Sequence, residues 1–478
     1  MTEKNLDSLK LKNTVIDGGY CIGCGACASV SSSMTVALDK YGRFQASLVS
    51  NSYDSFEEIS PLSVCPFSEK SIDEDKIGNE LFRKDCQYND KIGYYIDTYA
   101  GFVIEEDFQL RGSSGGFVTW ISALLLQEGL VDAIIHVREN DADSDKLLFK
   151  YEISFSLEDI KAGAKSRYYP VEMSQVLQIV RDNPIRYALV GIPCFIKAIR
   201  LLMRQDPVIA SRIKFCIGLV CGHLKTTAFA ESLAWLNGIE PDNILQIDFR
   251  KKNPESYAND YAVEITGIKN DQTVTIVQPM RNCSYLADWG VGLFKYKACD
   301  FCDDVVAETA DISFGDAWLP QYIKKGNGTN IIIVRNPTLH KLIEKFNNNN
   351  QIYLEKIEVE KVVESQAGGF RHRREGLSYR LFLTEQDNVW HPPKRVTSKT
   401  ENITEVEKQR FSMRYLIAEK SHLAFKIAKD NNNYSLFDAE LLPIISAYYK
   451  TYPQKKGRAI NFLRLMLKKI TSFIMGYY

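Results

Sequence analysis

Apolar residues run in short uninterrupted stretches through the middle of the chain, separated by segments with helical spacing. Such runs are typical of strands that are buried on both faces of a sheet. The sequence predicts strands at 131–137, 186–192, 214–221, 310–316 and 330–334, and helices at 117–126, 174–181, 195–203 and 337–346. Strands that alternate with helices across short connections indicate a mostly parallel sheet, whose sites lie at the carboxyl ends of its strands.

The two ends of the chain follow other patterns. Residues 33–38 and 42–49 alternate between apolar and polar positions around a turn at 39–42, which predicts a β-hairpin. From residue 347 the character changes, and from about residue 402 the chain reads as mostly helical. The segment from Arg458 to Ile474 separates cationic from apolar residues, as in a helix that docks on protein or lies on an anionic membrane surface.

Composition narrows the class of protein. The chain has 478 residues and a formal net charge of −1, so its total charge gives no reason to expect nucleic-acid binding. Its N-terminus is polar and lacks the apolar core of a secretory signal, and no apolar run approaches the ~20 residues that span a bilayer. We therefore expect a cytoplasmic protein whose cysteines serve as metal ligands more than as disulfides.

The strongest motif is a set of cysteines near the N-terminus. Cys21, Cys24 and Cys27 follow one another at two-residue intervals, and Cys65 stands just before Pro66. This spacing is typical of the ligands of a cubane [4Fe–4S] cluster. A zinc site, a disulfide pair and unrelated thiols are the alternatives. In a compact ferredoxin only three residues separate the third cysteine from the last. The predicted hairpin lies between Cys27 and Cys65 and explains the longer gap here.

A second set of cysteines is less complete in the sequence. Cys299 and Cys302 repeat the two-residue spacing, and Cys194 and Cys221 each follow a predicted buried strand. Parallel strands bring their carboxyl ends to one edge of a sheet, so these four residues are candidates for one site. Cys283 is the main competitor for that site. Zinc, or no metal at all, remains the alternative reading for Cys299 and Cys302.

Three further segments have the chemistry of anion binding. Residues 111–116 form a Ser/Gly loop before a predicted helix, a position that suits phosphate but often merely caps the helix. Residues 161–170 combine basic and aromatic side chains, as in a loop that grips an anionic cofactor, although spacing alone favours a solvated loop. Residues 248–252 end a short predicted strand in a cationic cluster.

Taken in order, these motifs resemble one family. The series Cys-x-x-Cys-x-x-Cys…Cys-Pro, Ser-Ser-Gly-Gly, Ser-Arg-Tyr, Gly-x-Pro-Cys, Cys-Gly, Phe-Arg-x-Lys, Cys-x-x-Cys and Ala-Asp-Ile-Ser-x-Gly-Asp is similar to the beta subunits of hydrogenases and dehydrogenases that reduce the deazaflavin coenzyme F420. Plant hydroxymethyl chlorophyll reductases and stand-alone bacterial relatives linked to surface-polysaccharide synthesis are similar too. The resemblance runs from about Gly19 to about Val334.

The resemblance implies cofactors and residues that hold them. It implies FAD beside one or two [4Fe–4S] clusters, the second held by Cys194, Cys221, Cys299 and Cys302. It implies that the flavin phosphates are cradled by Ser113, Ser114, Gly115 and Gly116. The pocket would be lined by Lys165, Ser166, Arg167 and Tyr168, and anionic groups would be held by Arg250 and Lys252. Relatives often have Cys-His-Gly where this chain has Cys-Gly-His, which puts any role of His223 in doubt.

The expected fold is α+β, with a small ferredoxin-like iron–sulfur head on a mixed, partly parallel flavin-binding core and a helical C-terminal extension. The expected regions are a head at 1–75, an N-terminal-type flavin-binding region at 92–180, a C-terminal-type region with the second cluster at 181–346, and a basic extension at 347–478. The basic stretch 368–374 and the C-terminal helices lie outside the family core and point to the polysaccharide-associated branch.

The leading functional hypothesis is a flavin-dependent reductase. Reduced ferredoxin or flavodoxin would supply electrons through the clusters to FAD, which would reduce an anionic substrate such as a nucleotide-linked or lipid-linked sugar. The candidate proton donors are His223, Tyr168, Tyr169 and Asp316. One rival is a deazaflavin-reducing subunit of a hydrogenase or dehydrogenase complex, and another is a non-enzymatic redox sensor. We also consider a homo-oligomer and peripheral contact with the inner face of the membrane through the C-terminal helix.

Overall fold

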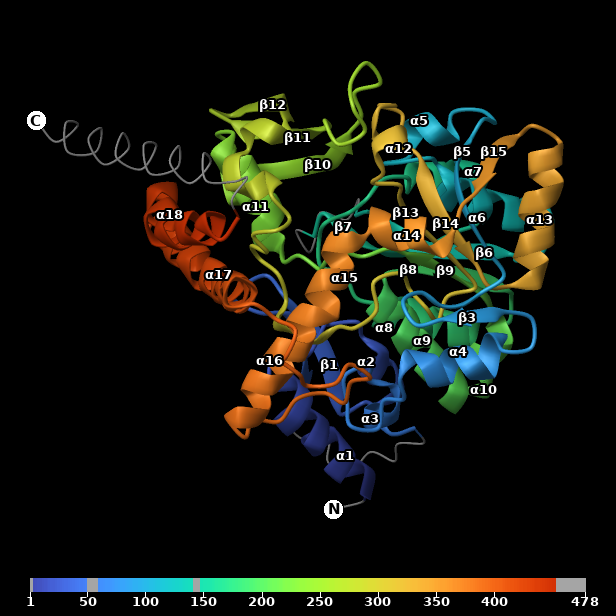
Figure 1. Ribbon diagram of the computed structural model, residues 1–478, viewed down its shortest axis with the longest axis horizontal. Coiled ribbons are helices and arrows are strands. Elements are labelled where there is room, and N and C mark those ends of the chain that lie inside the picture. The colour runs from blue at the N-terminus through green and yellow to red at the C-terminus, as the bar shows by residue number, and fades with distance from the viewer. Residues whose placement is uncertain (1–2, 50–58, 141–146, 453–478) are drawn as a thin grey trace, which may run out of the picture.

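An eight-stranded sheet lies at the centre of the computed structural model, which describes residues 3–49, 59–140 and 147–452 (Figure 1). Its strand order is β15-β5-β14-β13-β9-β8-β6-β7. The bounds are β5 Asp97–Val103, β6 Ala133–Glu139, β7 Phe149–Ser154, β8 Tyr187–Gly191, β9 Ile213–Leu219, β13 Ile312–Asp316, β14 Asn330–Val334 and β15 Ile352–Lys356. Strands β13, β9, β8 and β6 are parallel and the outer pairs antiparallel, which confirms the expected mixed, partly parallel sheet but not the mostly parallel sheet that the strand–helix pattern predicted.

Helices cover both faces of this sheet. One face carries α6 (Phe117–Gln127), α7 (Leu157–Ala162) and α13 (Pro337–Asn348), and the other carries α8 (Ser174–Asp182), α9 (Pro193–Gln205) and α10 (Pro207–Arg212). Successive strand residues point to opposite faces. Ala188 and Val190 of β8 accordingly pack with α6, whereas Leu189 packs with α8 and α9. The apolar runs of the sequence are therefore buried on both faces, as predicted.

The N-terminal part is small and packs directly against this body. It contains α1 (Glu3–Leu11), η1 (Lys12–Ile16), α2 (Ala26–Val30), β1 (Met34–Leu38), β2 (Phe44–Leu48) and α3 (Pro61–Val64). Strands β1 and β2 form the predicted hairpin, and the Asp39 side chain accepts hydrogen bonds from two backbone amides in its turn. Apolar residues from Leu11 to Phe67 share one continuous core with α8, α9 and the C-terminal helices.

The charged segment after this head forms regular structure. It contains α4 (Glu74–Phe82) and the short strands β3 (Gln87–Asn89) and β4 (Gly93–Tyr95), and Ile77 and Phe82 are buried. The helix begins at Asp73, whose side chain accepts from the Lys76 amide. Lys76 and Glu80 face solvent while Ile77 and Phe82 reach the core, a division that the high charge of the segment obscures in the sequence.

A smaller antiparallel sheet stands beside the main one. It consists of β10 (Ile244–Lys251), β11 (Ala262–Lys269) and β12 (Gln272–Pro279), and α11 (Thr227–Leu236) precedes it. The short elements are α5 Phe108–Arg111, α12 Pro320–Ile323, η2 Pro241–Asn243, η3 Met280–Asn282, η4 Ser284–Ala287 and η5 Lys297–Phe301.

The C-terminal part is helical, as predicted. It contains α14 (Val359–Ser365), α15 (Ala367–Arg373), α16 (Glu375–Gln386), α17 (Glu405–Asp430) and α18 (Tyr434–Lys450). Figure 1 shows α14, α15 and α16 descending from the main sheet toward the head. Strand β15 precedes these helices and pairs with β5, so residues after 347 also complete the main sheet. The proposed amphipathic segment from Arg458 to Ile474 lies outside the described residues.

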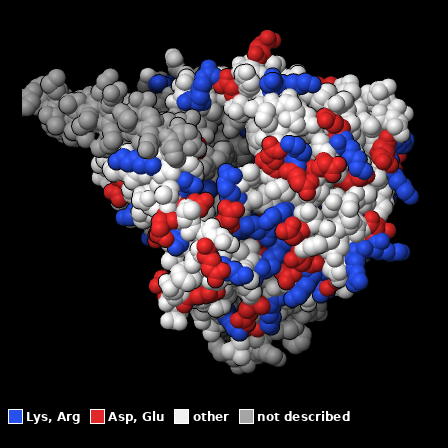
Figure 2. Space-filling model, in the orientation of Figure 1, with Lys and Arg blue, Asp and Glu red and all other residues white. Residues whose placement is uncertain are grey.

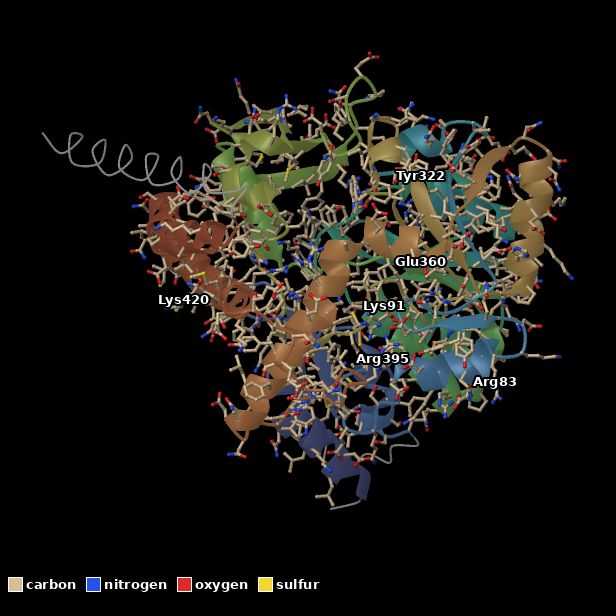
Figure 3. All side chains as sticks on the ribbon, in the orientation of Figure 1. Arg83, Lys91, Tyr322, Glu360, Arg395 and Lys420 are labelled. Carbon is tan, nitrogen blue, oxygen red and sulfur yellow. The ribbon has the colours of Figure 1, made fainter. Side chains whose placement is uncertain are left out.

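Ion pairs fasten this extension to the rest of the molecule. The Arg395 guanidinium, labelled in Figure 3, lies 2.5 Å from Glu308 and 2.9 Å from Asp75 of α4. The Tyr20 hydroxyl of the head donates to the Trp390 carbonyl oxygen at 3.1 Å. Cationic and anionic side chains are interspersed on the face drawn in Figure 2. Among the described helices, none combines the length and apolar character needed to cross a bilayer.

Candidate iron–sulfur and cofactor site

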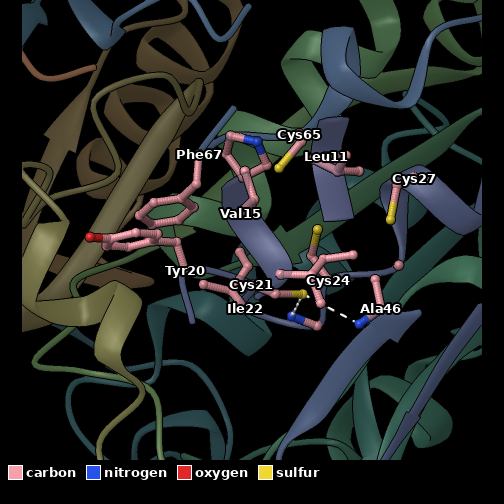
Figure 4. Close-up of a pocket in the computed structure, with 14 residues that line it drawn as sticks. Leu11, Val15, Tyr20, Cys21, Ile22, Cys24, Cys27, Ala46, Cys65 and Phe67 are labelled. Atoms are coloured by element: carbon pink, nitrogen blue, oxygen red, sulfur yellow. Dashed lines mark hydrogen bonds between the residues drawn. The ribbon is translucent and has the colours of Figure 1, made fainter. Parts of the chain in front are cut away.

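The four N-terminal cysteines line one small cavity (Figure 4). Cys21 and Cys24 lie in the loop before α2, Cys27 lies in its first turn, and Cys65 follows α3. Apolar side chains, among them Val15, complete the wall. The structure therefore brings the whole first set together from two segments that the hairpin separates in the sequence.

The environment of these thiols suits a buried metal group. Burial raises the pKa of Cys65 to about 12 and also raises the pKa of Cys24, so without a cation the thiols stay protonated. The backbone amides of Gly23 and Ala46 donate to Cys21 Sγ, each at 3.4 Å. Amide donors of this kind stabilise the negative charge of coordinated sulfur.

Gly23 provides a test of the loop geometry. We expect Gly23→Ala to abolish metal binding at the first cavity, because φ is +65° there and an added Cβ would lie 2.3 Å from the Phe44 carbonyl oxygen. Gly129→Ala is a matched control, since φ is +64° but no described atom lies within 4 Å of the added Cβ. Iron and sulfide content should fall by half in the first variant and stay unchanged in the second. Full iron content in Gly23→Ala would contradict the assignment.

The second set of cysteines lines another small cavity. Cys194 is the second residue of α9, directly after β8, and Cys221 follows β9, so the parallel pair β8–β9 brings both to one edge of the sheet. Cys299 and Cys302 come from η5 and the residue after it. The lining does not include the competitor Cys283, which is buried elsewhere.

A thin apolar wall separates the two cavities. Ile22 and Phe67 line both of them, and both side chains are buried. The electrostatic influence of the Cys24 thiol also reaches Cys194, where it contributes to a raised pKa whose largest cause is burial. Groups bound in the two cavities would therefore be neighbours, with little more than two side chains between them.

The donor sets fit iron–sulfur clusters. Each cavity offers four sulfur atoms, a set that binds zinc or a cluster. A tetrahedral zinc ion, with bonds of about 2.3 Å, draws four sulfurs together around one atom and leaves no cavity between them. Among the described residues, no three sulfurs of either set all lie within 4.8 Å of one another, a wider spread than a single zinc ion needs, and this favours the larger cubane group.

The Ser/Gly loop lies against the carboxyl end of the main sheet. Ser114 Oγ donates to the Thr329 carbonyl oxygen at 2.9 Å, and Ser113 Oγ accepts from the Ser166 amide at 2.8 Å. A Cβ at Gly115 would lie 2.7 Å from a carbonyl oxygen of β5, so only glycine allows this approach. The loop thus joins the segments around residues 113, 166 and 329, which are distant in the sequence.

Gly116 and Asn330 define the start of α6. Gly116 has φ +89° at the N-cap, a left-handed conformation that glycine adopts easily. The Asn330 side-chain oxygen accepts from the Phe117 amide at 3.4 Å, and its amide group donates to the Gly315 carbonyl oxygen at 3.0 Å. A neighbouring side chain therefore already occupies one amide at this helix N-terminus, as expected of a cap.

Cations gather beside the loop. Lys252 Nζ donates to three carbonyl oxygens, those of Gln109, Ser114 and Asn327. Burial and the nearby charges of Lys165 and Arg250 lower the pKa of Lys252 to about 7. Arg250 pairs with Asp316 at 2.7 and 3.0 Å. Because backbone carbonyls accept all three of its N–H bonds, Lys252 would act on an anionic group through its charge rather than through a hydrogen bond.

Two further features of this region suit a ligand site. The backbone of Lys165 has φ +108°, a conformation that costs energy in a non-glycine residue and is frequent at functional sites. Its side chain pairs with Asp248 at 3.0 Å. The Nε atoms of Arg167 and Arg250 are buried without a hydrogen-bond partner among the described residues. These residues fit an anionic cofactor such as FAD.

Comparison with known proteins identifies the family. Residues 98–178 match the model for the N-terminal part of the coenzyme F420 hydrogenase/dehydrogenase beta subunit, and residues 185–360 match the model for the C terminus of the same subunit. The chain belongs to the coenzyme F420 hydrogenase/dehydrogenase beta-subunit family. Hydrogenases and dehydrogenases are oxidoreductases, so this family places the chain among redox proteins.

Individual relatives are distant. An uncharacterized protein of Methanocaldococcus jannaschii is 25% identical over 68% of this chain and 86% of its own length. The coenzyme F420 hydrogenase subunit beta of Methanothermobacter thermautotrophicus is 21% identical over 50% of this chain and 81% of its own. A solved structure titled as a xenon derivatization of the F420-reducing [NiFe] hydrogenase complex of Methanosarcina barkeri is 14% identical over 62% of this chain and 96% of that chain, with a TM-score of 0.46.

The candidate proton donors of this beta-subunit homologue have unequal surroundings. Burial lowers the pKa of His223 well below its usual value, so its ring is neutral, and it lies 4.6 Å from the Trp289 ring with Nε2 unpartnered among the described residues. Burial raises the pKa of Tyr168, whose ring contacts Trp289 at 4.7 Å. Asp316 is held in the ion pair with Arg250. Tyr169 is buried, with its ring edge-to-face on Phe149 at 5.5 Å.

Arg167 and Arg373 make contacts that the sequence motifs did not indicate. The Arg167 guanidinium stacks over Phe149 at 4.7 Å and pairs with Glu139 at 3.1 Å, in addition to the role implied for it. Arg373 lies in the basic stretch expected outside the family core, yet it is buried and lines the second cysteine cavity. The sequence did not predict the buried position of Arg373, because a basic run in a helix usually faces solvent.

Proposed function

We propose that the chain is an electron-transfer oxidoreductase that exchanges electrons with a deazaflavin coenzyme of the F420 type inside a larger hydrogenase or dehydrogenase complex. The observation that carries the proposal is the pair of four-cysteine cavities whose linings share Ile22 and Phe67. Matches to F420 hydrogenase beta subunits support this role over the sugar reductase that the sequence suggested. Neither the structure nor the comparisons give a reason to retain a sugar substrate.

In this proposal the cysteines hold two [4Fe–4S] clusters. The first would be held by Cys21, Cys24, Cys27 and Cys65, and the second by Cys194, Cys221, Cys299 and Cys302. Iron–sulfur clusters supply single-electron transfer, and a flavin interconverts single electrons and hydride. The contribution of the chain is the apolar wall of Ile22 and Phe67, which excludes water and keeps the two sites close.

The cationic region beside α6 would hold the organic groups. Lys252 and Lys165 would attract the phosphates of FAD, and the Ser/Gly loop would approach them closely because Gly115 and Gly116 carry no side chain. Arg250 would be kept in place by Asp316. Binding of an anion beside Lys252 would favour the protonated ammonium and so raise its pKa from the low value set by burial.

The test is coenzyme reduction by the purified protein under anaerobic conditions. Protein reconstituted with iron, sulfide and FAD, and reduced with dithionite, should bleach the visible absorbance of added coenzyme F420. Nucleotide sugars should not reoxidise the reduced protein. Absence of bound flavin, or reoxidation by a sugar but not by F420, would overturn the proposal. Reconstituted protein without FAD is the control for direct reduction by residual dithionite.

A further inference from the structure

Arg373 is a buried cation at the second cysteine cavity. It is the last residue of α15, its exposed fraction is 1%, and its Nη1 donates to the Cys221 carbonyl oxygen at 2.6 Å. Among the described residues no carboxylate oxygen lies within 4.0 Å of its guanidinium, and its Nε has no hydrogen-bond partner. Arg373 lines the same cavity as Cys221, Cys299 and Cys302.

The first cavity has no comparable charge in the part of the chain that the structure describes. The cations that act on its sulfur atoms are Arg43, near Cys21, and Lys197, near Cys65. Arg43 pairs with Asp39 at 2.6 Å, and Lys197 pairs with Glu74 at 3.1 Å. Each of these cations is therefore compensated by a carboxylate, whereas the compensation of Arg373 is left to the cysteine sulfurs and whatever they bind.

We propose that Arg373 sets the reduction potential of the second cluster above that of the first. The inference rests on the proposed cluster at Cys194, Cys221, Cys299 and Cys302. Reduction adds one electron to a buried group that already carries thiolate ligands, and an uncompensated cation in a low-dielectric surrounding stabilises the added negative charge. The potential of the second site then lies higher, and an electron shared between the two sites resides at the second, nearer the sheet.

The test is a redox titration followed by electron paramagnetic resonance. In Arg373→Gln, which keeps an amide donor near Cys221 but removes the charge, one of the two midpoint potentials should fall and the other should stay. Arg373→Lys, which keeps the charge, should recover most of the shift. Arg371→Gln is the matched control, because Arg371 lies on the same helix but is exposed, and it should leave both potentials unchanged.

Other outcomes decide the matter as clearly. Unchanged potentials in Arg373→Gln would overturn the inference while leaving the proposed function intact. Equal shifts in the Gln and Lys variants, or loss of the second cluster from both, would show that shape rather than charge matters and would also overturn it. Loss of the second cluster from Arg373→Gln together with its retention in Arg373→Lys would support the role of charge. Wild-type protein with iron for only one cluster would refute the proposed second site itself.

Discussion

Replacing Cys299 and Cys302 together by serine should remove half of the iron and half of the sulfide from the purified protein. These residues contribute two of the four sulfur atoms of the second cavity, and the other two, from Cys194 and Cys221, cannot complete a cubane alone. The first cavity shares only the wall residues Ile22 and Phe67 with the second, so its own cluster should remain. Metal analysis and paramagnetic resonance of the reduced protein would measure the change.

The control for this experiment is Cys283→Ser. Cys283 is as buried as the cavity cysteines but belongs to neither lining, so its loss should leave iron and sulfide unchanged. Unchanged iron in the double variant would refute the second site. Complete loss of iron would mean that the two sites assemble together, and circular dichroism would then separate that effect from unfolding.

Arg250→Met should lower the free energy of unfolding by about 3 kcal/mol, since it removes one partner of a largely buried ion pair. The Arg250 side chain is 5% exposed and that of Asp316 is 21% exposed, and two hydrogen bonds join them. The arginine also stacks over Tyr261 at 4.9 Å and Trp318 at 5.5 Å, contacts that methionine only partly replaces. Retained flavin should fall in parallel, because the cationic region loses a charge.

The matched comparison is Arg186→Met on the surface. Arg186 forms an equally regular pair with Asp132, but its side chain is 45% exposed, so water replaces the lost partner and stability should hardly change. Urea unfolding of both variants under the same conditions measures the difference. Equal effects would argue against the buried role of Arg250, and normal flavin content in a destabilised Arg250→Met would remove this residue from the cofactor site.

Local patterns predicted most of the central sheet and both cysteine sets. Cys194 and Cys221 could be assigned together because each follows a buried strand, and parallel neighbours end at the same edge of a sheet. Spacing alone identified the first set. The hairpin between Cys27 and Cys65 was readable because its residues alternate and its turn contains Asp39 and Gly42.

Long-range packing decided what the sequence did not reveal. Arg371 and Arg373 are both arginines of α15, but only Arg373 is buried. The position of α15 against the rest of the protein decides which of the two faces inward. Lys252 looked like a free anion ligand, but three backbone carbonyls from separate loops surround it. Strand β15 lay beyond the expected end of the core, because pairing with β5 depends on an edge that no local pattern reports.

The contact between Tyr20 and Trp390 has a consequence for the order of assembly during synthesis. The ribosome releases the N-terminal head first, and domains usually fold as they emerge. Here Trp390 lies 370 residues after Tyr20, and Arg373 of the extension lines the second cavity. The lining of the first cavity, from Leu11 to Phe67, is made with the head, whereas the lining of the second is complete only after the extension has been synthesised.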